Sequence, residues 1–350
     1  MAAEIVAPFL VGIIRTTIDH TKKDLALNIK KVFLCYYKMV DKCHILQRKE
    51  RIVMGARQFK PIKRYLKIEE QVDHLKNEGM QIENDEFAKE VLSKVNYYHL
   101  SGYWYKLYNS DNKFVEGVTF NTIYNVYQFD SELRRLITDL TELVEIKLRT
   151  QIANYIGEKW GPLGYRDLTN FHDKDRHIEF LYSTNKRIEK YQDKAIVKHH
   201  KEVYGGRLPV WAFVEILSFS DLTKLYRNFK TTDKKTLIRR YYKEKSITKN
   251  IECTGNWIRT LCDIRNICAH YERLYDYQLK SAIYLPDEYK EYDKDDDRLF
   301  QAIILLKLLI NDNTIMTKFS TDLENLMKEF NFEGLDSMGF PEEWKTVLTK

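Results

Sequence analysis

Residues 260–276, TLCDIRNICAHYERLYD, place an arginine, an asparagine and a histidine inside an otherwise apolar helical pattern. Arg265 stays charged and can hold phosphate oxygens with its forked N–H groups. His270 carries an imidazole that takes and gives protons near neutral pH. Asn266 can orient a neighbouring group by hydrogen bonding. These residue types suit proton transfer around a phosphate ester.

The chemistry open to such a set is cleavage of RNA without a metal. A base removes the ribose 2′-hydroxyl proton, and that oxygen attacks the adjacent phosphorus. The guanidinium stabilises charge on the phosphoryl oxygens, and an acid protonates the leaving 5′-oxygen. One histidine cannot easily perform both proton transfers, whereas two copies of the chain facing each other can divide them.

Spacing alone leaves a structural interpretation open. On an ideal helix Asn266 and His270 share a face, whereas Arg265 lies about 140° from His270. Arginine and histidine at this spacing are common by chance, and a buried arginine–carboxylate pair with a hydrogen-bonded histidine is the more usual arrangement. A nucleophilic pair of Cys268 and His270 is weaker still, because the two residues point about 200° apart.

The element that carries these residues is predicted to be a buried helix. Its apolar residues recur on one face and are Trp257, Leu261, Ile264, Cys268 and Tyr271. The strongest helical signal covers residues 119–160, as one or two long helices that end at the GPLGY segment. Residues 208–229 predict a deeply buried helix, with Pro209 suited to its first turn.

The remaining chain also favours helices. Residues 66–80 and 85–104 have helical periodicity, and Asp85 is the predicted N-cap of the second helix. Residues 108–120 are irregular, and a small hairpin is predicted there. Residues 302–310 predict a buried helix despite Lys307. Only 6 prolines and 13 glycines occur in 350 residues, which favours an all-α fold.

Composition excludes several classes of protein. The hydrophobic fraction of 44% and charged fraction of 31% are typical of a globular chain with a sizeable core. The apolar run 5–14 is too short to span a membrane and follows Glu4, so we expect a cytoplasmic protein. Five cysteines without a C-x-x-C pair predict free thiols, with no disulfide framework, metal site or cofactor.

Basic charge is concentrated at the N-terminal end. Residues 1–65 hold 14 Lys and Arg against 5 Asp and Glu, whereas the other 285 hold 43 against 46. A basic arm of this kind can bind nucleic acid. The alternatives are a loosely attached extension over residues 1–58 and an upstream extension of the reading frame, because better organised sequence begins at Met54.

Eight ordered segments resemble a known family. They are EEQVDHLKNEGM, VNYYHLSGYWY, FDSELRRLI, VEIKLRTQIA, GPLGY, LPVWAFVEILSFSDLTKLY, RNICAHYERLYD and MGFPEEW. Their order over residues 60–350 is similar to that of Abi-like proteins, the bacterial abortive-infection family of the AbiD/AbiF type. The resemblance implies an all-α, HEPN-like helical bundle with additional N-terminal and inserted helices. Its core is expected at about 121–160 and 207–345, with an insertion at 161–206.

The resemblance also implies a function. The hallmark of HEPN proteins is an arginine, a polar residue and, a few positions later, a histidine. Arg265, Asn266 and His270 match it. Many HEPN proteins are metal-independent ribonucleases that pair two such motifs across a homodimer. The implied activity is RNA cleavage in a toxin-like anti-phage response, restrained by an RNA or protein antitoxin. The alternative is a non-catalytic RNA-binding or partner-binding module. A nucleotidyl-modifying role is weaker, because the chain lacks a glycine-rich phosphate loop.

Two further groups of residues are candidates for the site. Glu145 and Arg149 lie four residues apart on a helix and can pair with each other, or line the cleft opposite the histidine. An aromatic group can stack on unpaired bases, or else pack in a core. Its members are Tyr97, Tyr98, Tyr103 and Trp104.

Overall fold

A computed structural model describes residues 62–280, 282–293 and 297–350 of the chain. The predicted basic extension, 1–58, lies outside the described residues. The chain divides into the units Met1–Tyr65 and Leu66–Lys350, and every element described below belongs to the second unit. Within the described residues no strand forms, and β-pairing is limited to isolated bridges. The predicted all-α class is confirmed.

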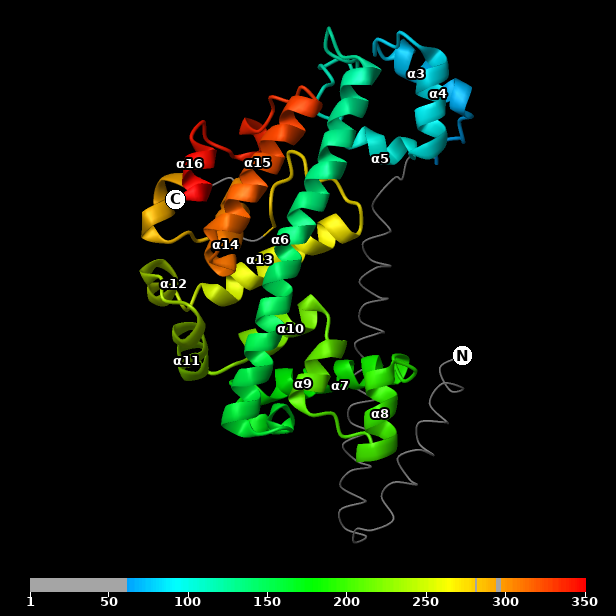
Figure 1. The fold of residues 1–350 in the computed structure, drawn as a ribbon. Coiled ribbons are helices and arrows are strands. Elements are labelled where there is room, and N and C mark those ends of the chain that lie inside the picture. The colour runs from blue at the N-terminus through cyan, green and yellow to red at the C-terminus, as the bar shows by residue number, and fades with distance from the viewer. Residues whose placement is uncertain (1–61, 281, 294–296) are drawn as a thin grey trace, which may run out of the picture. The chain divides into compact units, whose positions relative to one another are not determined.

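The longest element is α6, Phe120–Trp160, which the other helices of this unit surround (Figure 1). Thr119 caps its start by accepting a hydrogen bond from the Thr122 N–H at 3.0 Å. The helix ends at Gly161, whose φ of 80° lies in the region that favours glycine. Its 41 residues span about 60 Å. The sequence predicted this helix and its end at the GPLGY segment, and one continuous helix forms.

Three short helices pack on the first turns of α6 and form a small core of their own. They are α3 (Ile68–Asn77), α4 (Asp85–Lys94) and α5 (Tyr97–Ser101). The predicted single helix over 85–104 is therefore interrupted, because Val95 is extended and Asn96 starts a new helix as the N-cap of α5. Asn84 rather than Asp85 caps α4, since its side chain accepts the Phe87 N–H.

Residues 161–229 wrap around the far end of α6. After two 3₁₀ turns (Gly164–Arg166 and Leu168–Asn170) come four helices, which are α7 (Lys174–Lys190), α8 (Ala195–Tyr204), α9 (Val210–Phe213) and α10 (Phe219–Arg227). The region predicted to be one helix from 208 is broken between α9 and α10. A capping box causes the break, since Ser218 and Asp221 exchange hydrogen bonds at 3.1 and 3.2 Å.

The C-terminal part supplies the helix that carries the predicted motif. Its helices are α11 (Thr231–Tyr241), α12 (Lys245–Lys249), α13 (Thr254–Ala269), α14 (Leu299–Ile310), α15 (Asn313–Glu329) and α16 (Trp344–Thr349). Helix α13 crosses α6 and packs between α6, α10 and α14 (Figure 1). The buried helix predicted at 302–310 is confirmed as α14, and the Lys307 ammonium donates to the Val347 carbonyl at 2.5 Å.

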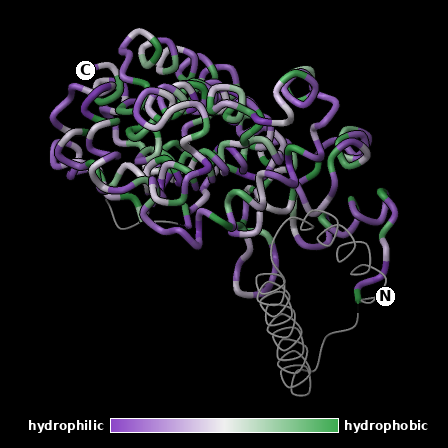
Figure 2. The backbone as a smooth tube through the Cα atoms, turned by 90° about the horizontal axis from the view of Figure 1, so that it is seen from below, coloured by the Kyte–Doolittle hydropathy of each residue, from purple (hydrophilic) through white to green (hydrophobic). Residues whose placement is uncertain are grey.

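The main hydrophobic core lies between α6, α10, α13 and α14. Hydrophobic and hydrophilic residues alternate along most helices in Figure 2, as expected where one face of each helix is buried. Trp257, Leu261 and Ile264 of α13 are fully buried, so the predicted stripe of this helix faces the core. None of the helices in the described residues is long and apolar enough to cross a membrane.

Candidate functional site

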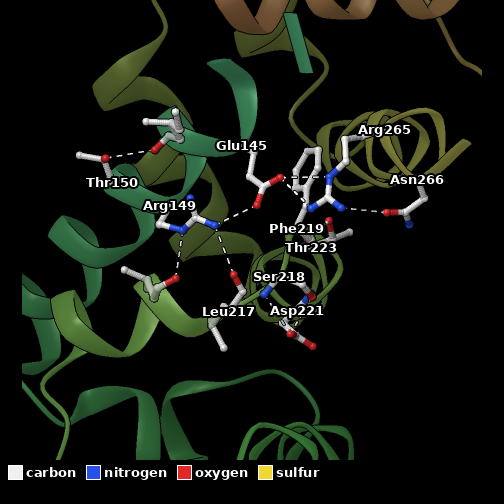
Figure 3. A network of polar contacts seen from close by, with 12 residues as sticks. Glu145, Arg149, Thr150, Leu217, Ser218, Phe219, Asp221, Thr223, Arg265 and Asn266 are labelled. Carbon is white, nitrogen blue, oxygen red and sulfur yellow. Dashed lines mark hydrogen bonds and ion pairs between the residues drawn. The ribbon is translucent and has the colours of Figure 1, made fainter. Parts of the chain in front are cut away.

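Arg265 projects from α13 toward α6 and meets Glu145 there (Figure 3). The Glu145 carboxylate oxygen Oε2 accepts hydrogen bonds from Arg265 Nη2 at 2.8 Å and from Nε at 3.2 Å. Arg265 Nη1 donates to the Asn266 side-chain oxygen at 3.1 Å. The Arg265 side chain stays 25% exposed, and its guanidinium carbon lies 5.8 Å from the Phe219 ring centre. Arg265 is thus held in place without being enclosed.

Glu145 also binds a second arginine through its other oxygen. Arg149 Nη2 donates to Glu145 Oε1 at 2.8 Å, as the i, i+4 spacing predicts. Arg149 further donates to the carbonyls of Val214 and Leu217 at 3.0 and 3.2 Å, which fixes the connection between α9 and α10. The Glu145 carboxylate therefore joins α6 to α13, and Arg149 extends the network to the connection between α9 and α10 (Figure 3).

His270 lies at the end of α13 rather than inside the helix. It is the C-cap residue and is exposed. Tyr271 follows with φ 59°, and the N–H groups of Tyr271 and Glu272 donate to the Cys268 and Ile267 carbonyls. This is a Schellman end, which usually has glycine where Tyr271 stands. Tyr271 was predicted to continue the buried stripe, but it is 73% exposed because the helix stops before it.

The structure brings some predicted residues together and leaves others apart. Arg265, Asn266, Glu145 and Arg149 form one chain of contacts. Among the described residues, no hydrogen bond or ion pair joins the His270 side chain to Arg265 or Asn266. The Asn266 side chain contacts Arg265 and not His270.

A buried carboxylate holds the loop that follows His270, and sequence reasoning missed it. Asp130 of α6 is fully buried and accepts hydrogen bonds from the backbone N–H groups of Tyr275 at 2.7 Å and Leu274 at 3.2 Å. Arg134 and the Tyr103 hydroxyl donate to the same carboxylate. Aspartate and arginine four residues apart in FDSELRR, on the apolar face of α6, are the signal that could have revealed this clamp.

A cleft of about 280 Å³ opens beside the motif. Its lining includes Asn266, Arg259 and Asp263 of α13 and, beyond the helix end, Glu272 and Lys280. Burial raises the pKa of Asp263, while the nearby cations Arg259 and Lys280 oppose that shift. A polar groove with mixed charge therefore borders Asn266.

The aromatic group is divided between core and surface. Tyr103 and Trp104 are 5% and 2% exposed, so their rings have no free faces for a base. Of the two alternatives, this burial favours core packing over base stacking for these two residues. Tyr97 is half-buried and meets the Trp104 ring edge-on at 5.4 Å. Only Tyr98 of the four is widely exposed, at 76%.

The cysteines of α13 are unsuited to nucleophilic catalysis. Burial raises the pKa of Cys268 to about 12 and also raises the pKa of Cys262. Thiols in such surroundings stay protonated and inert. Within the described part of the chain, Cys253, Cys262 and Cys268 are free thiols, and no group of three or more His, Cys, Asp or Glu side chains is arranged to hold a metal.

A comparison with models of protein families identifies the family of the chain. The sequence model of the Abi-like protein family matches residues 90–276. The chain belongs to the Abi-like family. The match runs from α4 to the loop after α13, which is narrower than the predicted 60–350 but contains Glu145, Arg265 and His270. Membership connects this Abi-like protein with abortive-infection defence. No curated protein and no solved structure matches the chain.

Proposed function

We propose that this Abi-like protein is a HEPN-type endoribonuclease of an anti-phage defence system. The observation that supports the proposal is the orientation and partial exposure of the Arg265 guanidinium. Its guanidinium has five N–H groups, and Nε, Nη1 and Nη2 each donate one bond to Glu145 or Asn266. Among the described residues, one N–H on each terminal nitrogen has no acceptor and can donate to a phosphate oxygen. A partly exposed, pre-oriented guanidinium on the helix that ends in an exposed imidazole suits phosphate chemistry.

Each residue has a defined part in the proposed reaction. An imidazole of His270 takes the proton of a ribose 2′-hydroxyl, and the oxygen forms a bond to the adjacent phosphorus. The bond from phosphorus to the 5′-oxygen breaks, and a protonated imidazole gives that oxygen its proton. Arg265 stabilises the charge on the phosphoryl oxygens. The products are a 2′,3′-cyclic phosphate and a 5′-hydroxyl end.

A homodimer supplies the two proton-transfer groups. One His270 cannot act as base and acid in the same step, so we propose that two copies of α13 contribute one imidazole each. The exposed end of α13, at His270 and Tyr271, leaves room for a second copy to approach. Phage infection would release the enzyme from an RNA or protein antitoxin in the cytoplasm, and RNA cleavage would then halt growth.

The alternative function is a non-catalytic RNA-binding or partner-binding module. The engagement of Arg265 with Glu145 and Asn266 is the observation that favours it, because a purely structural arginine makes contacts of this kind. In that case Arg265→Ala lowers the melting temperature, and His270→Ala leaves RNA affinity in the folded protein unchanged. Neither variant then alters any cleavage rate, because the wild type has none.

Cleavage of RNA in EDTA distinguishes the two functions. Wild type is compared with His270→Ala and Arg265→Ala, and His199→Ala serves as a matched control because His199 is an exposed histidine on α8. We expect cleavage by wild type and the control only, with cyclic phosphate ends in the products. A substrate with 2′-O-methyl ribose should resist cleavage. Equal cleavage by all four proteins, or cleavage of the methylated RNA, would refute the proposal.

A further inference from the structure

A second candidate site lies between α7 and α10, apart from the motif of α13. It is a pocket of about 480 Å³ whose lining includes Arg176 and His177 of α7 and, at the end of α10, Lys224, Arg227 and Asn228. Three of these side chains are cationic, and the lining contains one carboxylate, that of Glu179. The pocket thus has an excess of positive charge.

The two walls of the pocket are fixed to each other. The Asn228 side chain accepts a hydrogen bond from the Asp173 N–H at 3.0 Å and donates to the Asp173 carbonyl at 2.9 Å. These bonds hold the first turn of α7 against the last turn of α10. Further along, Arg187 of α7 pairs with the buried Asp221 of α10 at 3.0 Å. The positions of Arg176 and Arg227 are therefore set before any ligand arrives.

The cations of the pocket are available to a ligand. Among the described residues, no hydrogen bond or ion pair engages the side chains of Lys224 or Arg227, whereas the exposed Arg176 pairs with Asp173 at 3.2 Å. Burial lowers the pKa of Arg227, and repulsion from Arg259 and Arg176 lowers it further, although Asp263 opposes this. The negative end of the α10 dipole helps to hold Lys224 and Arg227 without carboxylate partners. An anion entering here relieves repulsion among like charges.

A buried histidine in the lining gives a second, independent indication of a ligand. His177 is fully buried, and its Nε2 lies 2.7 Å from the Tyr165 carbonyl, so Nε2 is the donor. Burial lowers the pKa of His177, which keeps the ring neutral and makes Nδ1 an acceptor. Within the described residues Nδ1 has no hydrogen-bond partner. A ribose hydroxyl is a donor of the required kind, whereas free inorganic phosphate at neutral pH is chiefly an acceptor.

The pocket and Arg265 lie at opposite ends of α10. Helix α10 begins at Phe219, beside Arg265, and ends at Arg227, so the two ends are about 12 Å apart at 1.5 Å per residue. Arg259 of α13 is close enough to repel Arg227, and it lines the cleft that borders Asn266. At 3.4 Å per stacked nucleotide, this distance corresponds to about three to four nucleotides of one strand.

We propose that this pocket binds a phosphodiester of a single-stranded RNA whose neighbouring segment reaches Arg265. The inference rests on the proposed ribonuclease function and adds the substrate class, an unpaired strand several nucleotides long. Lys224 and Arg227 bind the phosphate, Arg176 stands at the rim, and His177 accepts from the ribose. Arg259 adds a third cation between the pocket lining and the cleft beside Asn266, along which the strand can pass toward Arg265.

The test measures binding of a fluorescently labelled, unstructured 12-nucleotide RNA in the His270→Ala background, which prevents cleavage by the proposed mechanism. Lys224→Gln/Arg227→Gln is compared with Lys318→Gln/Lys328→Gln, which removes the same charge from α15. For the pocket variant we expect affinity to fall by about tenfold or more, and the slope of log K against log salt to shrink by about 1.4. The α15 variant should keep the parental slope, and thermal melts check that both variants fold. The swap Lys224→Arg/Arg227→Lys should restore binding.

Two further arms separate this inference from its alternatives. A labelled 2-nucleotide RNA is too short to reach both sites, so its affinity should depend less on the pocket. Labelled ATP that binds more tightly than the 12-mer, and is lost in the pocket variant, would overturn the RNA assignment in favour of a free nucleotide. Unchanged RNA binding in the pocket variant also overturns the inference, even if His270-dependent cleavage stands. Conversely, RNA binding that needs the pocket, in a wild type that cuts no RNA, supports the pocket and refutes the ribonuclease.

Discussion

The carboxylate of Glu145 and the guanidinium of Arg265 lie 2.8 Å apart, although 120 residues separate them in the chain. The same carboxylate also binds Arg149, so it carries two cations from different elements. An arginine that approaches a phosphate loses less freedom when its orientation is already fixed. We therefore regard Glu145 as the positioning residue for Arg265.

Replacing Glu145 by glutamine should affect both stability and cleavage. Glu145→Gln removes the negative charge shared by Arg149 and Arg265, and hydrogen bonds to charged groups are worth about 1.5–3 kcal/mol each. We expect the free energy of unfolding in urea to fall by about 1–3 kcal/mol, and kcat/KM for RNA by about 10- to 100-fold, equivalent to about 1.4–2.7 kcal/mol.

A neighbouring glutamate provides the control for this prediction. Glu142 is exposed on the same helix, and Glu142→Gln should change stability by less than about 0.5 kcal/mol. In an Arg265→Ala background, Glu145→Gln should cost less stability than in the wild type, because one of the two arginines that the carboxylate binds is gone. An equal loss of stability in both backgrounds would show that Glu145 acts independently of Arg265.

Cys268 should be protected from alkylation in the folded protein. Its pKa of about 12 leaves fewer than about one thiol in 10⁴ ionised at pH 7.5, and the side chain is 5% exposed. Peptide mass spectrometry after iodoacetamide treatment should show Cys268 and Cys262 labelled only in urea, with the half-buried Cys253 labelled earlier. Cys268→Ala should retain RNA cleavage. Rapid native labelling at Cys268, or loss of cleavage in the variant, would revive a thiol mechanism.

The periodic signals of the sequence predicted the scaffold of the site correctly. Helix α6 and the buried stripe of α13 follow from apolar spacing, and the pairing of Glu145 with Arg149 follows from the i, i+4 rule. These features are local, so neighbouring residues determine them. The contact of Glu145 with Arg265 depends on how α13 crosses α6, and no local pattern specifies that crossing.

The predictions for two helix ends were wrong, for different reasons. The break at Ser218 had a readable signal, since Ser218 and Asp221 have the spacing of a capping box, but the apolar run around them masked it. The end of α13 had no such signal, because Tyr271 occupies a position that glycine usually marks. As a result, the 140° angle assumed between Arg265 and His270 describes a helix that stops at Ala269.

Acid should destabilise the protein through His177. Burial lowers the pKa of His177 in the folded state below its ordinary value, so the unfolded chain binds more protons once the pH falls below about 6.5. Stability therefore decreases as the pH falls from about 6.5, by at most about 1.4 kcal/mol per pH unit for this group. Urea unfolding between pH 7.5 and 5 measures the slope. His177→Asn should reduce it, whereas the exposed His172→Asn should not; equal slopes in both variants would contradict the assignment.

Replacing Tyr271 by glycine should stabilise the end of α13. At φ 59° a Cβ atom crowds the following carbonyl, and the Tyr271 side chain, 73% exposed, has no hydrogen bond or ring contact with the described residues to lose. We expect Tyr271→Gly to raise the free energy of unfolding by about 0.5–1 kcal/mol and the melting temperature by about 1–2 °C. Tyr271→Ala is the matched control, because alanine keeps the Cβ atom and should give no gain. An equal gain from both variants would show that the tyrosine ring, and not its backbone conformation, is unfavourable at this position.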